Sequence, residues 1–518
     1  MEETRTKNSV YNILSNVLVY FEKYVLTFIV RTIFIKILGA TYLGVNGLLS
    51  NVLSMLSLAE LGIGTAISFN LYKPLAQNDS KTISSLMTFY KKAYNIIGVI
   101  VASVGMMVFA CLNFIIKDAD SIPHLKIIYI LFLINTVSTY YTSYKEILII
   151  ADQKYYKLTK INVVYTLLLN IFQIIVLILF RNFIVYLIVQ FFIQILQKIS
   201  INKKIGKLYE NIDFKSEDKV SDNIIAELKK NVKAMVVHKV GDYCINGTDN
   251  IIISSFINVI EVGIYSNYTM IVNAINSIIT TIYNSITASF GNLLVENNGT
   301  KAENIFRKLE FIEYLLYSTF SVIFISSLNL IIEIWIGKEY VFSENIVWLI
   351  SFNFFLTGTR MAITIVRNSA GEYDKDKYIP IIQSIVNILV SIWGAKKFGI
   401  FGVILGTVIS SILPCIYRPY IVYKYVFKKD FKKYLINTYL KYVSIFIATS
   451  ILIVKLRINV PNIYVRLIAN VCIAIILQIA INIVIFKKTE EYDYCIKILK
   501  NTCMKFIRKV QKHEEFKS

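Results

Sequence analysis

Long apolar stretches alternate with short polar segments along almost the whole chain, from near Tyr11 to near Phe486. Most of them reach the roughly 20 residues that an α-helix needs to cross a bilayer with its backbone hydrogen bonds satisfied internally. The pattern predicts about fourteen spans, or as few as about twelve because 183–196 and 378–393 are short. The expected bounds are 11–35, 43–71, 93–116, 127–150, 158–180, 183–196, 232–257, 262–290, 311–336, 346–366, 378–393, 400–423, 434–456 and 465–486.

Composition points to the same class, an all-α integral membrane protein. The 518 residues are 56% hydrophobic and only 17% charged, and the mean hydropathy is +0.58. A soluble fold could not hide this much apolar surface in one core. The cysteines show no paired spacing and the three histidines lie far apart, so the sequence offers no disulfide framework and no metal site. It also lacks a G-x-x-x-x-G-K-[ST] loop. We expect no cofactor.

The distribution of basic residues predicts the orientation of the spans. With a cytoplasmic N-terminus, about 39 Lys and Arg residues fall in cytoplasmic segments and about 10 in outer loops, a strong positive-inside bias. Both termini are therefore expected in the cytoplasm. The net charge of +21 then reflects orientation and attraction to anionic lipid. No nucleic-acid-reading motif accompanies it, so no nucleic-acid partner is expected.

Landmarks in the first half recur 219 residues later. Gly44 and Gly263 follow the first and seventh spans, and Ala151 and Ala370 each precede a charged loop. Six spans per half is an even number, so the two halves form a parallel repeat of the kind that rocks about a central site. The predicted organisation is an N-lobe at 1–199, an interlobe cytoplasmic linker at 200–231, a C-lobe at 232–425, two additional spans at 426–486, and a basic amphipathic cytoplasmic tail at 487–518.

Motifs in both halves carry a family resemblance. They lie at 31–48, 56–64, 71–76, 370–372 and 397–407, together with Asn387. These stretches resemble Wzx-type polysaccharide and O-antigen flippases of the MATE-like MOP superfamily. The resemblance covers nearly the whole chain and identifies no particular sugar.

That resemblance implies a function in the bacterial cytoplasmic membrane. The cargo would be an undecaprenyl diphosphate-linked oligosaccharide repeat unit, moved from the inner to the outer leaflet for capsule, O-antigen or exopolysaccharide synthesis. Two lobes would alternate in access around a polar cavity, with no ATP site. Implied partners are membrane lipids and polysaccharide polymerase or assembly proteins. Coupling to a proton or Na⁺ is left open.

Two other functions compete with the flippase. One is a MATE-like exporter of small molecules, against which stand the second-half motifs and the two extra C-terminal spans. The other is a membrane glycosyltransferase or polysaccharide polymerase, for which Asp118 and Asp120 form a D-x-D. The expected outer loops are short and hold no catalytic constellation, so we predict that the protein is not an enzyme.

Charges within the apolar stretches mark a candidate headgroup site, because an unpaired ion there costs at least about 2.5 kcal/mol. Asn353, Arg360 and Arg367 are seven residues apart, which places them on one stripe of a continuous helix. Lys145, one repeat earlier, and Arg31 complete the candidate set for a diphosphate or sugar. Alternatively, Arg360 pairs with a carboxylate such as Glu60, while Lys145 and Arg367 extend to the membrane surface.

A second set of charges suits ion coupling or a pair between lobes. His238, Asp242 and Asp249 share a helix face in the seventh span, and Lys23 lies 219 residues before Asp242. Glu60 completes this set. A static pair of Asp242 with His238 or with Lys239 is the structural alternative.

Overall fold

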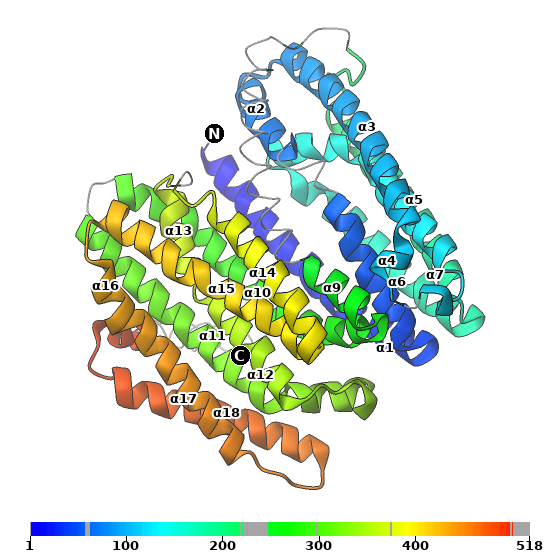
Figure 1. Ribbon diagram of the computed structural model, residues 1–518. Helices are drawn as coiled ribbons and strands as arrows, with labels where there is room; N and C mark the ends of the chain where they lie inside the picture. Colours follow the sequence, from blue (N-terminus) through cyan, green and yellow to red (C-terminus); the bar gives the residue numbers. More distant parts are fainter. Residues whose placement is uncertain are drawn as a thin grey trace, which may run out of the picture. The chain divides into compact units, whose positions relative to one another are not determined.

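The computed structural model describes residues 2–56, 63–117, 119–216, 220, 225, 247–295, 299–372, 375–497 and 500, with side-chain contacts from residue 25 onward. All regular structure in these segments is helical (Figure 1). The chain forms two compact units, Met1–Ser266 and Asn267–Ser518. The expectation of an all-α membrane fold is thus confirmed.

The first unit is built mainly from long helices. Its elements are α1 (Glu2–Leu56), α2 (Ile63–Gln77), α3 (Ser80–Ala110), α4 (Leu112–Ile115), η2 (Ala119–Ser121), α5 (Leu125–Ala151), η3 (Tyr155–Leu158), α6 (Thr159–Phe180), α7 (Phe183–Leu208), α9 (Thr248–Phe256) and the start of α10 (Val259–Val295). Helices α2, α3 and α5 enclose a core that includes the buried rings of Tyr90, Tyr94 and Tyr144. Their other faces leave many large apolar side chains exposed, as expected for helices surrounded by lipid.

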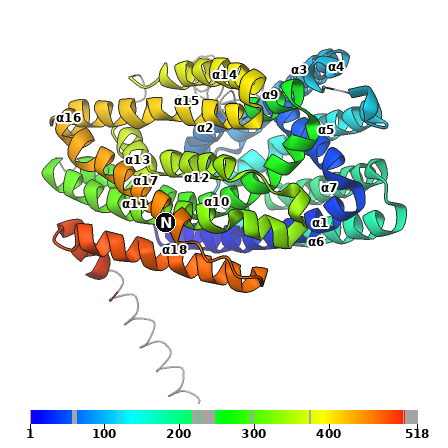
Figure 2. The same cartoon turned by 60° about the horizontal axis from the view of Figure 1, so that its bottom comes forward.

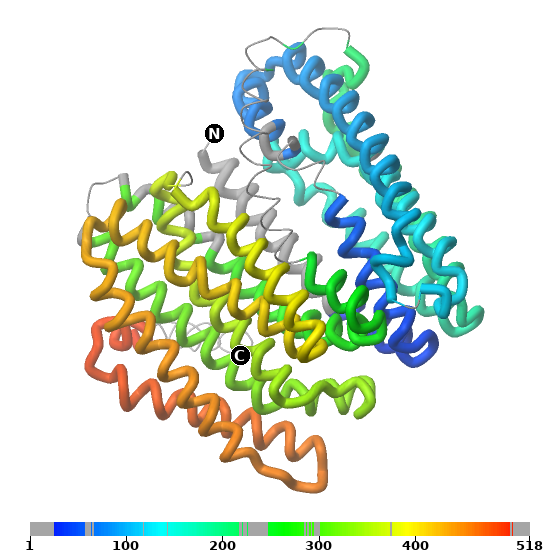
Figure 3. The backbone as a smooth tube through the Cα atoms, viewed as in Figure 1, coloured from blue at the N-terminus to red at the C-terminus, as the bar shows by residue number. Residues whose placement is uncertain are grey.

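The second unit continues from α10 with a similar bundle. Its elements are α11 (Gly299–Ile336), η4 (Lys338–Tyr340), α12 (Glu344–Gly358), α13 (Met361–Ser369), α14 (Ile379–Phe398), α15 (Ile400–Ile421), η5 (Val422–Phe427), α16 (Phe431–Tyr434), η6 (Leu435–Tyr439), α17 (Leu440–Leu456) and α18 (Ile463–Phe486). Helices α17 and α18 form a hairpin, orange in Figure 3, that packs against α11. Stacked rings join α17 to α11, with Tyr314 and Tyr442 at 4.2 Å between centroids, and to α12, with Phe355 and Phe446 also at 4.2 Å.

Ten described helices are long and apolar enough to cross a membrane, or eleven if the bent α5 is one span. The chain is a multi-pass membrane protein. The predicted count of fourteen is not reached in the described part of the chain. Most of the expected span 232–257 lies outside the described residues, and so does most of the basic tail expected at 487–518.

Several boundaries differ from the predicted ones for local reasons. The first expected span runs a few residues beyond Ile35, since α1 consists of two helices that meet at a kink at Gly39, where φ is 78°, between the expected spans 11–35 and 43–71. The sixth span is not short, since α7 runs for 26 residues. The tenth is not one continuous helix, because α12 ends at Gly358 and α13 begins at Met361.

Two of the predicted landmark glycines pack directly against each other. A Cβ on Gly44 would lie 1.8 Å from the carbonyl oxygen of Val259, and one on Gly263 would lie 2.5 Å from the carbonyl oxygen of Ala40. The backbones of α1 and α10 therefore meet where neither residue has a side chain. Small residues at such crossings let membrane helices approach closely.

The second-half motif also has a packing role. Helices α14 and α15 lie side by side in both views (Figures 1 and 2). A Cβ on Gly402 would lie 2.2 Å from the backbone of Gly394, and one on Gly406 would lie 2.3 Å from Ser391 Oγ. Asn387 Nδ2 donates across this contact to Thr407 Oγ1 at 3.1 Å. The motif at 397–407 thus specifies a tight helical hairpin.

Candidate functional site

A polar pocket of about 470 Å³ lies within the first unit, among α1, α5, α6 and α7. We call it the first-unit pocket. Its polar lining residues are Thr27, Arg31, Asn46, Glu146, Tyr155, Asn162, Thr166, Asn170, Gln173, Tyr186, Gln190, Gln194, Gln197 and Lys198. Burying so many polar side chains among apolar membrane helices costs free energy. Polar clusters of this kind are therefore candidate functional sites.

Two helices supply most of these side chains at helical spacing. On α6 they are Asn162, Thr166, Asn170 and Gln173, and on α7 they include Gln190, Gln194 and Gln197, besides Tyr186 and Lys198. Steps of three and four residues keep each set on one face. The opposite faces carry exposed apolar residues such as Phe172 on α6 and Phe192 on α7. Both helices therefore turn amides inward and apolar side chains outward.

Hydrogen bonds between the amides fix the walls of the pocket. Gln197 Nε2 donates to Asn162 Oδ1 at 3.1 Å, and Asn162 Nδ2 donates to the hydroxyl of Tyr155 at 3.3 Å. Further along, Gln173 Nε2 donates to Gln190 Oε1 at 3.3 Å. Interhelical bonds of this kind orient the side chains without neutralising all of their donors and acceptors.

The pocket carries an excess of positive charge. Lys198 pairs with Glu146 and also lies 3.5 Å from Ser143 Oγ. The remaining charged group is Arg31, which donates a hydrogen bond to the hydroxyl of Ser266. With two cations and one carboxylate in the lining, the pocket favours a neutral or anionic ligand.

The chemistry of this lining suits hydroxyl-rich or phosphate-bearing molecules. Amides both donate and accept hydrogen bonds, as sugar hydroxyls require, and a guanidinium can hold phosphate oxygens with two parallel bonds. Of the predicted headgroup residues, Arg31 lines this pocket. Lys145 does not line it, and its ammonium instead lies 4.5 Å from the ring centroid of Phe214.

Arg367 belongs to a buried ion cluster in the second unit. It pairs with Asp376, whose carboxylate also lies 3.1 Å from Arg418 Nε. Asp376 is fully buried and Arg367 is 7% exposed. Arg367 therefore does not extend to the membrane surface, the alternative that its sequence position left open.

The break between α12 and α13 separates Asn353 from Arg360. The buried carboxylate of Glu313, on α11, accepts hydrogen bonds from the backbone N–H groups of Met361 and Ala362 at the start of α13. Arg360 lies at the break, within electrostatic reach of Glu313. Asn353 Oδ1 accepts a hydrogen bond from Ser411 Oγ at 2.9 Å. The continuous helix assumed for the stripe is therefore interrupted between Asn353 and Arg360.

Of the predicted ion-coupling residues, Asp249 is the one with a described side chain. It is buried in the first turn of α9, and its charge acts on Tyr265. Glu60, His238, Asp242 and the side chain of Lys23 lie outside the described residues. Their roles remain predictions.

The glutamines of α7 were missed by the sequence interpretation. Gln190, Gln194 and Gln197 stand at intervals of four and three residues within an apolar run. Read as a helix, that spacing forms one polar face, and this signal was available in the sequence.

Comparison with known proteins shows which solved structures have a similar fold. The sequence matches no protein-family profile and no curated protein. Among solved structures, the lipid II flippase MurJ in an inward closed conformation is similar over 92% of this chain and 99% of its own, with 16% identity and a TM-score of 0.64. An inward-facing multidrug resistance MATE family transporter of the MOP superfamily is similar over 76% and 93%, with 13% identity and a TM-score of 0.60.

A third structure, a mutant of the Vibrio cholerae MATE transporter VcmN, is similar over 82% of this chain and 100% of its own, with 11% identity and a TM-score of 0.57. At these identities the likeness concerns the fold. The protein therefore has the helical architecture shared by MATE transporters and MurJ.

Proposed function

We propose that this protein is a flippase that moves a polyprenyl diphosphate-linked oligosaccharide repeat unit from the inner to the outer leaflet of the bacterial cytoplasmic membrane. The first-unit pocket carries the proposal. It is an amide-rich, net cationic pocket within a bundle of membrane helices, and its chemistry fits sugar hydroxyls and phosphate oxygens. The cycle would use alternating access of the two predicted lobes.

The extent of the structural likeness supports a flippase over a small-molecule exporter. Residues 426–518, which hold α17 and α18, are 93 of the 518. A match over 92% of the chain, as with MurJ, must include more than half of them. The match to the MATE transporter covers 76%. The small-molecule exporter is nevertheless the second candidate, because both MATE structures described above share the fold.

The deciding experiment measures on which leaflet the undecaprenyl-linked glycan lies in cells that lack this protein. The flippase predicts that the glycan is complete and accumulates on the inner leaflet. Normal leaflet distribution together with new sensitivity to toxic small molecules would favour the exporter. Unextended or missing glycan would favour a glycosyltransferase or polymerase instead.

Pocket variants connect this result to the site. Gln194 lines the pocket without a hydrogen bond to any described residue, so Gln194→Leu removes an amide without breaking an internal contact. We expect it to slow glycan export, and Arg31→Gln to slow it further. Gln77→Leu, at the exposed end of α2, is the matched control and should leave export unchanged. Export at the normal rate in both pocket variants would exclude this pocket from the transport path.

A further inference from the structure

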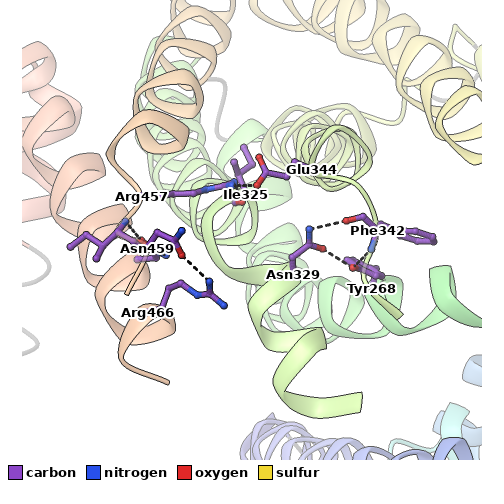
Figure 4. Close-up of polar contacts among 10 residues, drawn as sticks. Tyr268, Ile325, Asn329, Phe342, Glu344, Arg457, Asn459 and Arg466 are labelled. Atoms are coloured by element: carbon purple, nitrogen blue, oxygen red, sulfur yellow. Dashed lines mark hydrogen bonds and ion pairs between the residues drawn. The ribbon is translucent and has the colours of Figure 1, made fainter. Parts of the chain in front are cut away.

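A second polar pocket, of about 390 Å³, lies at one end of the second unit where α17 turns into α18. We call it the turn pocket (Figure 4). Helices α11 and α12 form its other wall. The lining residues are Ile325, Ser326, Asn329, Leu330, Glu344, Val347, Val454, Arg457, Ile458, Asn459, Arg466 and Asn470.

The turn between the two helices brings two arginines into this pocket. Arg457 follows the last residue of α17, and its Nη1 donates to Glu344 Oε1 at 2.7 Å while its Nη2 donates to the carbonyl of Ile325. Arg466, in the first turns of α18, donates from Nη1 to Asn459 Oδ1 at 2.9 Å and lies 3.9 Å from a carboxylate oxygen of Glu333. Figure 4 shows both guanidinium groups on the same side of the α17–α18 turn.

Both guanidinium groups keep donors that the described residues do not use. The buried Nε–H of Arg457 and that of Arg466 have no hydrogen-bond partner there. Buried donors without partners are rare and often indicate an ion or other group bound nearby. A guanidinium presents its donors as a planar fork that matches phosphate and carboxylate oxygens. Each arginine thus keeps one donor, its Nε–H, for which the described residues supply no acceptor.

The amides of the pocket do not supply that acceptor, because they hold the walls in place. Asn470 accepts from the backbone N–H of Ile458 at 2.8 Å and donates to its carbonyl at 3.3 Å. Asn329 donates to the carbonyl of Phe342 at 2.9 Å and accepts from the hydroxyl of Tyr268 at 2.6 Å. These bonds fix both asparagines in the pocket wall, beside the two arginines that line it.

The mouth of the turn pocket is continuous with an apolar surface. Val454 and Ile458 line the pocket and are also exposed, and Leu456, Val465 and Ile468 lie beside them with half or more of their surface exposed. Because α17 and α18 are candidate membrane spans, these side chains lie at the end of the hydrocarbon region. A ligand here meets guanidinium groups on one side and apolar side chains on the other.

We propose that the turn pocket binds a phosphate group, and that an anionic membrane lipid presents it, with the acyl chains along the exposed apolar residues of α17 and α18. The orientation predicted from the basic residues places this end of the helices at the outer leaflet. The proposal does not depend on the glycan cargo. An inorganic phosphate ion would use the same donors without the apolar contact.

The carboxylates of Glu344 and Glu333, which lie beside the two arginines, allow the proposed phosphate binding to be tested. Glu344, with a 64% exposed side chain, occupies a donor of Arg457, so it competes with an incoming phosphate. Removing its charge with Glu344→Gln should raise lipid affinity if the arginines are a binding site. If Arg457 and Glu344 merely tie the turn to α12, the same substitution should leave affinity unchanged and only lower thermal stability. Glu333, 3.9 Å from Arg466, opposes phosphate more weakly.

The experiment measures retention of phosphatidylglycerol by the full-length protein, using native mass spectrometry after delipidation and titration in detergent. Arg466→Gln is the main variant, because Arg466 makes fewer internal contacts than Arg457. We expect it to weaken phosphatidylglycerol binding roughly tenfold, the effect of losing one charge-assisted hydrogen bond. The matched control is Arg181→Gln, an exposed arginine between α6 and α7, which should bind as the wild type does.

Two further arms identify the source of the phosphate. Phosphatidylcholine, which carries no net charge, should bind more weakly than phosphatidylglycerol. Competition by millimolar inorganic phosphate would show that the phosphate group itself is recognised, while resistance to it would assign a larger share of the affinity to the acyl chains. Equal binding by wild type and Arg466→Gln, with normal thermal stability, overturns the proposal, as does Glu344→Gln that binds no better than wild type.

Discussion

The contact between α1 and α10 makes a sharp prediction about one methyl group. In Gly44→Ala the new Cβ would lie 1.8 Å from the carbonyl oxygen of Val259, 2.8 Å from its carbonyl carbon and 3.2 Å from the nitrogen of Gly263. All three atoms belong to the backbone of α10, so no side chain can rotate away. The two helices must separate, or one of them must bend. Three residues along the same helix, a Cβ on Gly47 would meet its nearest atom, Ser266 Cβ, at 3.8 Å.

These distances predict that replacing glycine by alanine lowers stability at position 44 and leaves it unchanged or raises it at position 47. Overpacking a close contact costs typically about 1–3 kcal/mol, and a backbone clash belongs at the upper end of that range. Replacing a helical glycine by alanine returns about 1 kcal/mol of helix propensity. Gly44→Ala should therefore be destabilised by about 2 kcal/mol. Gly47→Ala, which meets only ordinary van der Waals contact, should be unchanged or stabilised by up to about 1 kcal/mol.

Thermal unfolding of the purified variants in detergent, followed by intrinsic fluorescence, measures this difference. Gly44→Ala should unfold at a lower temperature than wild type, and Gly47→Ala at the same or a higher one. Gly263→Ala, whose Cβ would lie 2.5 Å from the carbonyl oxygen of Ala40, should resemble Gly44→Ala. Equal unfolding temperatures for Gly44→Ala and Gly47→Ala would refute the backbone contact between these helices.

Three further predictions follow from other parts of the chain. Asp376→Asn leaves the buried Arg367 and the partly buried Arg418 without their carboxylate, so it should cost about 3–5 kcal/mol and lower the unfolding temperature. Hydrogen bonds from the hydroxyl and N–H of Thr82 hold the pKa of Asp79 below its ordinary value, so Asp79→Ala should speed amide exchange at the start of α3 at neutral pH. That difference should shrink as the pH falls below about 4, the ordinary pKa of an aspartate, and should vanish once the pH is below the lowered pKa of Asp79 and the carboxylate is protonated. In single-cysteine variants, an impermeant maleimide should label exposed Cys111 in intact cells if the predicted orientation holds. Cys495, whose pKa burial raises to about 11, should react slowly even after permeabilisation.

Many helices of the fold could be predicted from the sequence, because an apolar stretch of sufficient length predicts a membrane-spanning helix. The predicted segments 127–150, 158–180 and 465–486 agree with α5, α6 and α18 within two residues at each end. Breaks within these helices were harder to predict. The break at Thr359 and Arg360 is stabilised by Glu313, which is far away in the sequence and caps α13 across the bundle. Hydropathy carries no information about such a partner.

In the candidate site, too, features of a single helix could be predicted from the sequence, whereas contacts between distant segments could not. The amides of α6 and α7 follow helical spacing, so each polar face could be derived from one segment. The pocket itself could not, because its charged residues Arg31, Glu146 and Lys198 come from α1, α5 and α7. Which cation faces a pocket and which is neutralised by a distant carboxylate depends on helix packing, which single-sequence patterns do not specify.

The packing also ranks the predicted headgroup residues by the cost of releasing each one for a ligand. Arg367 is buried with Asp376, and breaking a buried ion pair costs about 3–5 kcal/mol, so a phosphate would have to recover that energy before it gained affinity. Arg31 donates instead to a neutral hydroxyl, that of Ser266, and exchanging one such bond costs about 1 kcal/mol. Arg31 also lines a pocket large enough for a sugar. Of these two residues, we therefore expect Arg31 to be the better ligand for the proposed headgroup, and Arg367 to be the better anchor for the fold.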